Sequence, residues 1–333
     1  MGSDEEHELS PKLPFIDFSS SKLKPGTPIW DSLKPQVREA LEVYGCFEAS
    51  FDDGNTINPG ELRRDVFSSL KELFDLPLHI KQQSGVAQPF QHGYAAPNPF
   101  YQSFGMDDPN LLDAVETFTK TLWPRGGNPS FSNNIHSMAG VVSEFDRTVR
   151  RMILESFGLE KYIDEHLSST TYHFRVMKYE AVQHHGETEL GLRVHTDKSF
   201  MTVLCQNEVG GLELQTKRGE WVKFKPTSPS SFVVLIGDAL HVWLNGSVHC
   251  PKHKVTLRHL HDKSRYSFGL FTIPKPDYVI KAPEELIDEE HPLRFKPFAY
   301  QEYFGLAYSK SGVKDASILH VPMFPPPIVT SKL

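Results

Sequence analysis

The stretch "VHTDKSFMTVLCQ", residues 194–206, joins a histidine and an aspartate two positions apart to a run that is typical of a β-strand. Side chains two positions apart on a strand lie on the same face of a sheet, so we expect His195 and Asp197 to lie side by side. The pair is either a polar couple on the outside of a sheet or part of a metal site. A third ligand elsewhere in the chain would decide between these two interpretations.

The sequence around this stretch, from about residue 169 to residue 276, consists of short β-rich runs separated by turn residues. Their near-regular spacing predicts an antiparallel sandwich or barrel, and a count of eight suits a jelly roll, the double-stranded β-helix. The sequence has neither an alternation of strands and helices nor a glycine-rich phosphate loop, which excludes the nucleotide-binding α/β folds. The eight runs are "YHFRVMKY", "FMTVLCQ", "GLELQT", "WVKFKP", "SFVVLIGD", "HVWLNG", "HKVTLRH" and "RYSFGLFTI".

The rest of the chain differs in pattern, so we expect a mixed α and β fold in three parts. Residues 1–168 predict a helical region, within which the aromatic, proline- and glycine-rich stretch 88–110 is expected to be a lid loop. Residues 169–276 form the predicted jelly-roll core, and residues 277–333 form a C-terminal helical segment with a proline-rich tail. Apolar residues recur at helical spacing over 28–45, 58–77 and 133–157.

An iron site with two histidines and one carboxylate on one face of the metal needs one more imidazole beside His195 and Asp197. His253 stands where the run "HKVTLRH" enters the sheet, so it is the favoured third ligand, and His249 is next in line. The histidines available in the later strands and their connections are His241, His249, His253, His259 and His261.

Arg265 and Ser267, in the run "RYSFGLF", are also two positions apart and therefore share a face. A guanidinium beside a hydroxyl matches a carboxylate, because the fork of N–H groups takes two oxygens and the hydroxyl adds one donor. On the run "YHFRVMKY", Arg175 and Tyr179 share one face, and the Tyr179 hydroxyl could join the same site. An iron site near such a clamp suggests a diacid co-substrate, bound by iron at one end and by arginine at the other.

His-x-Asp at 195–197, His253 and Arg-x-Ser at 265–267 together resemble the plant-type 2-oxoglutarate- and iron(II)-dependent dioxygenases. The likeness covers nearly the whole chain, because "LPFIDF", "ALEVYGCFEA", "ELFDLPLHIK" and "LWP" look like that family's N-terminal landmarks. The segments "DEEHPLRFKPF" and "RRMILESFGLEKYIDEHL" look like the branch that contains the alkenyl- and hydroxyalkyl-producing dioxygenases of glucosinolate metabolism. That branch also resembles steroidal alkaloid hydroxylases, so branch membership does not give a substrate.

This resemblance implies a set of ligands and a reaction. The reaction would consume O₂, release succinate and CO₂, and hydroxylate, desaturate or otherwise oxidise a small plant specialised metabolite, with ascorbate supporting activity. Met177 and Lys254 stand where many relatives have asparagine and arginine, but neither belongs to the triad or the clamp. In this reading His195, Asp197 and His253 hold Fe(II), while Arg265, Ser267 and Tyr179 bind 2-oxoglutarate.

Four residues are candidates for contact with the organic substrate. By the alternation of side chains along a strand, Phe271 and Arg175 are expected to point inward near the iron site. Phe100 and Tyr101 stand in the expected lid. For each of these four residues the alternative is packing in the core or in an ordered surface loop.

Two other functions are compatible with these motifs. One is an oxidase of the same fold that needs no 2-oxoglutarate and uses Arg265 and Ser267 to hold a substrate carboxylate. The other is a non-catalytic jelly-roll protein with a relict metal site. Succinate release that accompanies turnover separates the dioxygenase from the first, and O₂ consumption separates it from the second.

Composition limits the partners. Acidic residues outnumber basic residues by 42 to 35, so no broad basic field is available for nucleic acid. The longest apolar run, Phe232–Ile236, is far too short to cross a bilayer, and three cysteines cannot form a disulfide framework. These observations indicate a protein of a reducing compartment with no nucleic-acid or membrane partner. We further expect a monomer that acts on a small-molecule substrate.

The tripeptide Ser331-Lys332-Leu333 resembles a peroxisomal address that is read by an import receptor. The proline-rich segment before it is expected to be extended, which would leave the tripeptide accessible. We expect a fluorescent protein fused to the N-terminus to collect in peroxisomes and to stay diffuse when Leu333 is deleted. Diffuse fluorescence from both fusions would contradict this prediction and leave a cytoplasmic protein.

Overall fold

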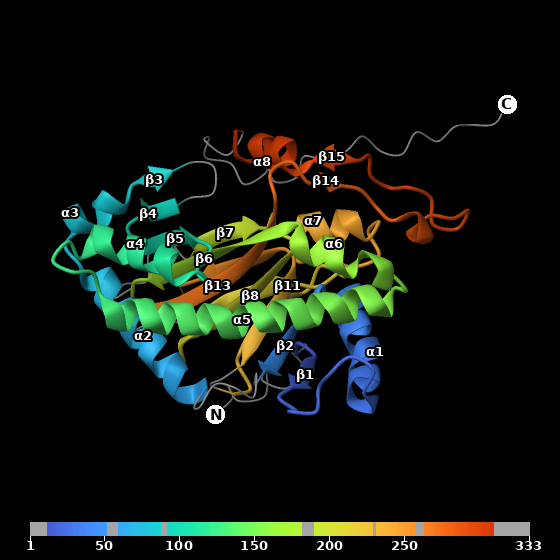
Figure 1. Ribbon diagram of the computed structural model, residues 1–333, viewed down its shortest axis with the longest axis horizontal. Helices are drawn as coiled ribbons and strands as arrows, with labels where there is room; N and C mark the ends of the chain where they lie inside the picture. The colour runs from blue at the N-terminus through green and yellow to red at the C-terminus, as the bar shows by residue number, and fades with distance from the viewer. Residues whose placement is uncertain are drawn as a thin grey trace, which may run out of the picture.

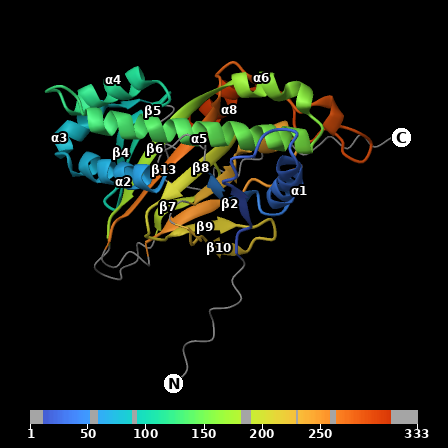
Figure 2. The same ribbon diagram turned by 60° about the horizontal axis from the view of Figure 1, so that its bottom comes forward.

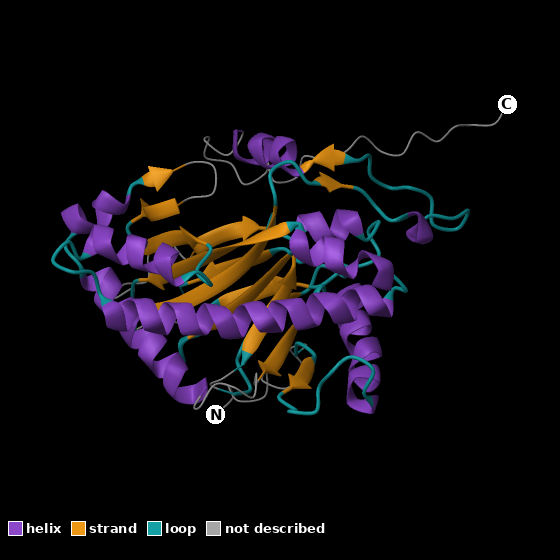
Figure 3. Ribbon diagram, in the orientation of Figure 1, coloured by secondary structure: helices purple, strands orange, loops and turns teal. Residues whose placement is uncertain are grey.

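The computed structural model describes residues 12–51, 59–87, 92–181, 190–228, 231–257 and 263–309. Its centre is a pair of facing four-stranded antiparallel arrays, which together form the predicted jelly roll (Figure 3). The order in the large sheet is β11 (Phe232–Ile236), β8 (Met201–Gln206), β13 (Arg265–Pro274) and β6 (Thr170–Tyr179). The order in the small sheet is β10 (Trp221–Lys223), β9 (Leu212–Gln215), β12 (His253–Thr256) and β7 (Leu190–His195).

An apolar core joins the two sheets. Met177 and Leu204 of the large sheet belong to the same buried cluster as Leu214 and Val255 of the small sheet. Alternation along each strand places every second side chain in this layer, so odd-numbered residues of β6 and β13 face the small sheet. The residues expected to form the site are therefore directed into the space between the sheets.

Helices cover the other face of the large sheet (Figures 1 and 2). The long helix α5 (Pro129–Ser156) lies across the strands and packs against α1 (Pro28–Val43) and α2 (Pro59–Asp75). A second buried cluster fills this layer, with aromatic and aliphatic side chains from α5 meeting the even-numbered residues of β6 and β13. The predicted helices over 28–45, 58–77 and 133–157 are confirmed within a few residues at each end.

A buried ion pair fixes α5 to the strands that carry the site. Asp146 and Arg150 approach to 2.8 Å, and both side chains are almost fully buried. Asp146 also accepts hydrogen bonds from Thr272 of β13 and from Tyr172 of β6. A buried charge pair is stable only when its remaining hydrogen-bonding positions are satisfied, so this network fixes how the helix sits on the sheet.

The expected lid loop is largely a β-hairpin. Strands β4 (His92–Asn98) and β5 (Tyr101–Asp107) pair with each other, and β5 pairs along its length with β6. The N-terminal region also contributes two strands that were not expected from the sequence, β1 (Phe15–Phe18) and β2 (Cys46–Phe51), at the opposite edge of the large sheet. The large sheet thus has nine strands instead of four.

Two further elements of the core differ from the sequence prediction. The run "HVWLNG" forms no strand: its first three residues end helix α7 (Asp238–Trp243) and its last three form a turn. Strand β7 replaces this run in the count of eight. Gly237 is the N-cap of α7, and a Cβ added there would lie 2.0 Å from the carbonyl oxygen of Ser199. Only glycine allows the chain to pass this close before it turns into the helix.

The remaining elements are short apart from two helices. Helix α8 follows strand β15 near the C-terminal end of the described chain, which agrees with the expected C-terminal helical segment. Ser331-Lys332-Leu333 lies outside the described residues. Among the described residues, none of the helices has the length and apolar character needed to span a membrane. These elements are α3 (Leu78–Lys81), η1 (Gln82–Ser84), β3 (Val86–Ala87), α4 (Leu112–Leu122), η2 (Glu160–Tyr162), α6 (Ile163–Ser168), β14 (Val279–Ile280), η3 (Glu284–Leu286), β15 (Phe298–Ala299) and α8 (Tyr300–Ser309).

Candidate metal and co-substrate site

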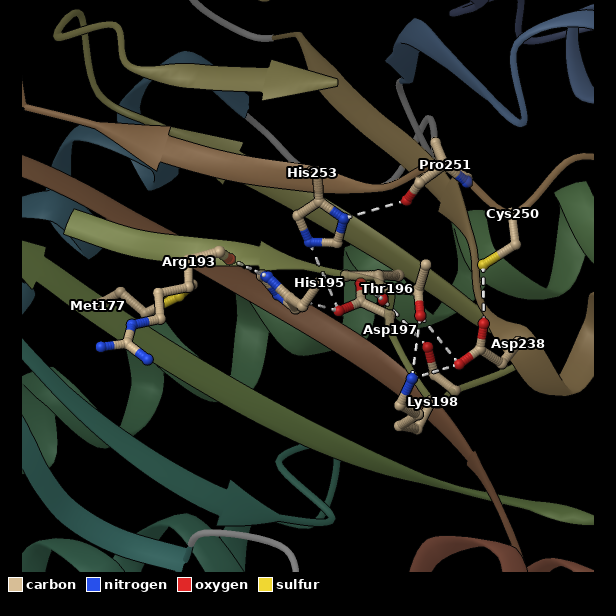
Figure 4. A network of polar contacts seen from close by, with 12 residues as sticks. Met177, Arg193, His195, Thr196, Asp197, Lys198, Asp238, Cys250, Pro251 and His253 are labelled. Atoms are coloured by element: carbon tan, nitrogen blue, oxygen red, sulfur yellow. Dashed lines mark hydrogen bonds and ion pairs between the residues drawn. The ribbon is translucent and has the colours of Figure 1, made fainter. Parts of the chain in front are cut away.

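Two histidines and an aspartate meet at one end of the small sheet (Figure 4). His195 ends β7 and His253 begins β12, and the two residues are paired across the strands with their ring centroids 4.1 Å apart. The sequence suggested that Asp197 shares a strand with His195. In the structure Asp197 instead lies two residues beyond the end of β7. Its Oδ1 lies 3.8 Å from Nε2 of His195 and 3.6 Å from Nε2 of His253.

The surroundings leave the Nε2 atoms of both histidines available as ligands. Nδ1 of His195 lies 2.8 Å from the carbonyl oxygen of Arg193, and Nδ1 of His253 lies 3.4 Å from that of Pro251. A carbonyl accepts only from a protonated nitrogen, so each Nδ1 carries the proton and each Nε2 keeps its lone pair. Burial and the nearby His253 lower the pKa of His195, which favours the neutral ring that a metal requires.

Asp197 is oriented from the large sheet. Its Oδ2 accepts a hydrogen bond of 2.6 Å from Oγ1 of Thr202 on β8, which leaves Oδ1 directed toward the two imidazoles. The backbone N–H of Asp238 donates to the carbonyl oxygen of Asp197 at 2.8 Å. The carboxylate therefore faces the histidines because both its side chain and its backbone are held.

A second polar network, centred on Asp238, holds the residues that flank Asp197 (Figure 4). The Asp238 carboxylate accepts hydrogen bonds from Thr196, at 3.0 Å, and from Tyr303 of α8, at 2.7 Å, and it forms an ion pair with Lys198. Burial alone would raise the pKa of Asp238, but Lys198 and the hydrogen bonds hold it below its ordinary value. The residues on both sides of Asp197 are thus anchored to one buried carboxylate.

Arg265 is a fully buried cation on the inner face of β13. Its guanidinium donates to Oγ of Ser267 at 3.1 Å and to Oε1 of Gln206 at 2.9 Å. Among the described residues none of the carboxylates pairs with it, and its Nε has no hydrogen-bond partner. A buried charge without a counter-ion is costly, so this arrangement suits an anionic ligand such as the carboxylate of 2-oxoglutarate.

Tyr179 and Arg175 lie on the neighbouring strand β6. The Tyr179 ring packs under the Arg265 guanidinium, 4.9 Å from its carbon, and burial raises the pKa of Tyr179, so its hydroxyl remains a donor. Arg175 donates to Oγ of Ser103 at 2.9 Å. Its neighbours across both adjacent strands are glycines, Gly105 and Gly269, which leave room for the arginine on this face.

Of the candidate substrate residues, Phe271 and Arg175 lie on the inner face of the large sheet, whereas Phe100 and Tyr101 pack in the core. Phe271 lies on the same face of β13 as Arg265 and is partly exposed. Tyr101 is buried in the core between the sheets, with its ring 5.0 Å from that of Tyr179, so it is not part of a lid. Phe100 forms the turn of the β4–β5 hairpin and packs against the same core.

Thr202 and Gln206 are site residues that were not singled out from the sequence. They are four positions apart on the run "FMTVLCQ", so they share a face, and Gln206 pairs with Ser267 across β8 and β13. The sequence signal for both residues is that they are polar and flank the apolar residues 203–205. Its meaning depends on strand pairing, which the sequence alone does not specify.

A jelly roll with a His-Asp-His group at one end and a buried arginine between its sheets is typical of mononuclear non-haem iron oxygenases. Comparisons with known proteins agree with this class. The family model described as the 2OG-Fe(II) oxygenase superfamily matches residues 170–274, which run from the start of β6 to the end of β13 and contain all eight strands of the jelly roll. "Probable 2-oxoglutarate-dependent dioxygenase AOP1.2" of Arabidopsis thaliana is 48% identical over 316 residues, which cover 94% of this chain and 96% of that protein.

Other relatives extend the likeness to solved structures. "2-oxoglutarate-dependent dioxygenase AOP3" of Arabidopsis thaliana is 33% identical over 405 residues, covering 93% of this chain and 97% of the relative. The crystal structure of the dioxygenase for auxin oxidation from rice superposes with a TM-score of 0.74 and 30% identity, covering 92% of this chain and 99% of that one. The 2-oxoglutarate complex of the Arabidopsis thaliana enzyme for auxin oxidation gives 0.71 and 28%, covering 84% and 99%.

The chain belongs to the 2-oxoglutarate- and iron(II)-dependent dioxygenases. It is an oxidoreductase that uses Fe(II) and 2-oxoglutarate and acts on a small molecule. The resemblance to this branch of the family is confirmed as well, because the relatives named AOP match this chain over almost their whole length.

Proposed function

We propose that this dioxygenase oxidises a C–H bond of a small plant specialised metabolite, consuming O₂ and releasing succinate and CO₂. The observation that carries the proposal is the buried Arg265, without a carboxylate partner among the described residues, on the sheet that faces His195, Asp197 and His253. In the alternative oxidase Arg265 would bind a substrate carboxylate instead. The relatives are named as 2-oxoglutarate-dependent dioxygenases, which favours the dioxygenase.

Each residue of the site has a separate task in this proposal. The lone pairs on Nε2 of His195 and His253 and on Oδ1 of Asp197 would hold Fe(II) from one side, which leaves the opposite side for other ligands. Iron held by these residues, together with 2-oxoglutarate and O₂, would supply the oxidising power needed to attack a C–H bond. Arg265, Ser267 and the Tyr179 hydroxyl would bind the far carboxylate of 2-oxoglutarate and fix its direction.

The chain must also position the organic substrate and exclude water from the reacting carbon. Phe271 and Arg175 lie on the inner face of adjacent strands, where they would contact the substrate directly. We further propose that the enzyme acts as a monomer and that ascorbate supports its activity. Import into peroxisomes remains a prediction from the sequence.

The test of this function is an untargeted screen of plant extracts for compounds that the purified enzyme consumes. We expect at least one compound to disappear only when Fe(II), 2-oxoglutarate and O₂ are all present, with succinate formed in equal amount. Product formation without succinate would favour the oxidase. Absence of both product and O₂ uptake with iron bound would favour the non-catalytic protein.

Replacement of Phe271 by alanine should change product distribution or substrate choice more than the KM for 2-oxoglutarate. The reason is that its ring, partly exposed on the central strand, would contact the organic substrate and not the co-substrate. Product analysis for competing substrates, together with KM for 2-oxoglutarate, measures this difference. Phe271→Leu is the matched control, since it keeps most of the apolar volume.

A loss of thermal stability in Phe271→Ala with unchanged selectivity would contradict the substrate role. Phe271 would then be a core residue, in keeping with its packing against the larger hydrophobic cluster.

A further inference from the structure

A second group of two histidines and one aspartate lies on the large sheet, away from the iron triad. His92, Asp107 and His173 come from β4, β5 and β6, which are consecutive strands of that sheet. Nδ1 of His173 lies 2.8 Å from Oδ1 of Asp107, and Nδ1 of His92 lies 3.0 Å from Oδ2. The two rings meet edge to face, with centroids 5.5 Å apart.

The distances distinguish this group from a metal site. In the triad, Oδ1 of Asp197 stays 3.6 and 3.8 Å from the two Nε2 atoms, beyond hydrogen-bonding distance, as expected around an ion. In the second group each imidazole closes onto a separate oxygen of Asp107 at 3.0 Å or less. Asp107 therefore acts as a hydrogen-bond acceptor that orients the histidines.

This orientation fixes which nitrogen of His173 carries the proton. A carboxylate accepts hydrogen bonds, so Nδ1 of His173 is protonated and Nε2 keeps its lone pair. Nε2 lies across the ring from Nδ1 and is directed away from Asp107. Burial lowers the pKa of His173, although Asp107 opposes this effect, so the ring remains neutral near pH 7.

The acceptor on His173 is buried and unused. The residue is 6% exposed, and its Nε2 has no hydrogen-bond partner among the residues that the structure describes. A buried polar atom without a partner costs about 1–3 kcal/mol. Such a cost is typical of an atom that a ligand satisfies, and the Asp107 contact prevents the ring from turning its nitrogen elsewhere.

A row of paired residues on three adjacent strands connects His173 with the iron triad. It pairs with Phe271 on β13, and Phe271 pairs with Thr202 on β8, whose hydroxyl holds the metal-facing Asp197. Adjacent strands are about 4.8 Å apart, so His173 stands two strands, or roughly 10 Å, from Thr202. A small organic molecule spans this distance.

The row formed by His173, Phe271 and Thr202 is accessible to solvent at Phe271. Of the ten residues of β13, all of them described, only Phe271 is partly exposed although β13 is a central strand. Asp107, whose side chain is half exposed, and the partly exposed His92 stand at the outer end of the row. The buried His173 stands between them and Phe271. An organic substrate that reaches the triad over Phe271 would therefore meet Nε2 of His173.

We propose that Nε2 of His173 accepts a hydrogen bond from a hydroxyl or N–H group of the organic substrate, with Asp107 and His92 holding the ring in place. This inference rests on the proposed function and narrows its substrate class to molecules with a donor group remote from the carbon that is oxidised. His173 is thus a substrate-binding residue, and Asp107 is a positioning residue that acts through it.

The first experiment needs no substrate. Protein with ¹⁵N-labelled histidine is loaded with Zn(II) in place of iron and with 2-oxoglutarate, and nitrogen chemical shifts are measured by NMR, with His173→Phe assigning the signal. We expect a neutral His173 with the proton on Nδ1, and loss of this preference in Asp107→Ala. A proton on Nε2 would overturn the proposal, as would a shift of both nitrogens when a second equivalent of Zn(II) is added.

The second experiment uses matched pairs of probes, each a small hydroxylated plant metabolite and its O-methyl ether. For pairs that stimulate succinate release, the wild-type enzyme should prefer the free hydroxyl by about 10- to 100-fold in kcat/KM. His173→Phe should bring this ratio near one, and His173→Gln, which keeps an acceptor, should restore part of it. The KM for 2-oxoglutarate should stay unchanged in both variants.

The control variant is His136→Phe. His136 lies on α5, where its Nε2 contacts the carbonyl oxygen of Asn110 at 3.2 Å. This variant should keep the wild-type ratio. An unchanged ratio in His173→Phe would overturn the proposal. If no probe stimulates succinate release in the wild type, the result counts against the proposed function, and the NMR measurement still decides the role of His173.

Discussion

Replacement of His253 by alanine should remove bound iron and abolish turnover that depends on 2-oxoglutarate. The structure brings three ligand atoms together, and the described residues offer none to replace a lost one. Loss of a partner that only orients a metal ligand typically costs 10- to 100-fold in affinity or activity, so loss of the ligand itself should exceed about 100-fold. Iron content per chain and succinate release measure the two effects, and His195→Ala and Asp197→Ala should behave alike.

His249→Ala is the matched control for this prediction. His249 lies four residues before His253, but its Nε2 contacts the carbonyl oxygen of Gln215 at 3.2 Å and does not face the triad. It should keep iron and most of the activity. Full activity in His253→Ala, or loss of iron in His249→Ala, would show that the third ligand has been assigned wrongly.

Replacement of Arg265 by alanine should raise the KM for 2-oxoglutarate strongly. A charge-assisted, bidentate contact in a buried site contributes about 2–4 kcal/mol, which corresponds to roughly 30- to 1000-fold. The affinity for the organic substrate should change much less, because that molecule would bind nearer Phe271. Steady-state kinetics with each substrate varied in turn separates the two effects.

The stability of the Arg265 variants must be measured alongside, because the side chain is fully buried. Arg265→Lys keeps the charge and most of the volume but loses the fork of donors, so it should show an intermediate KM. If only the KM of the organic substrate rises and succinate is never formed, Arg265 binds that substrate and the oxidase alternative is correct.

The core of the fold and the triad could be predicted because their signals are local. Seven of the eight β-rich runs contain a strand, since alternation and turn residues within each run are sufficient to identify it. His195 was identified by its two-residue spacing from Asp197, and His253 by its position at the start of a β-rich run. The structure pairs the two histidines across β7 and β12. Asp197 was placed beside His195 correctly, but for the wrong reason, because it lies past the strand.

The hairpin of β4 and β5 could not be predicted because its stability comes from β6, which is about 70 residues away in sequence. Proline and glycine within this stretch are typical of loops, and tertiary pairing overrides that local preference. Tyr101 accordingly moves from an expected lid into the core. The grouping of His92, Asp107 and His173 depends on the same pairing, so it could not be predicted from local sequence signals.

The local signal also failed for α7. The run "HVWLNG" has the β-branched and aromatic residues of a strand, but the chain enters it through Gly237 at a close contact with Ser199. The turn and the Asp238 network then favour a short helix. Asp238 itself, which anchors Thr196, Lys198 and Tyr303, could be identified only from the three-dimensional arrangement.

The central claim is that His195, Asp197 and His253 hold iron while Arg265 and Ser267 bind the co-substrate beside it. An anaerobic titration of the Fe(II) protein with 2-oxoglutarate tests it most directly, because chelation of iron by the 2-oxo acid gives a visible charge-transfer absorption. The wild type should develop this absorption with one equivalent bound, His253→Ala should not develop it, and Arg265→Ala should develop it only at far higher 2-oxoglutarate. Equal titration curves for the wild type and Arg265→Ala, or full absorption in His253→Ala, would contradict the assignment of the site.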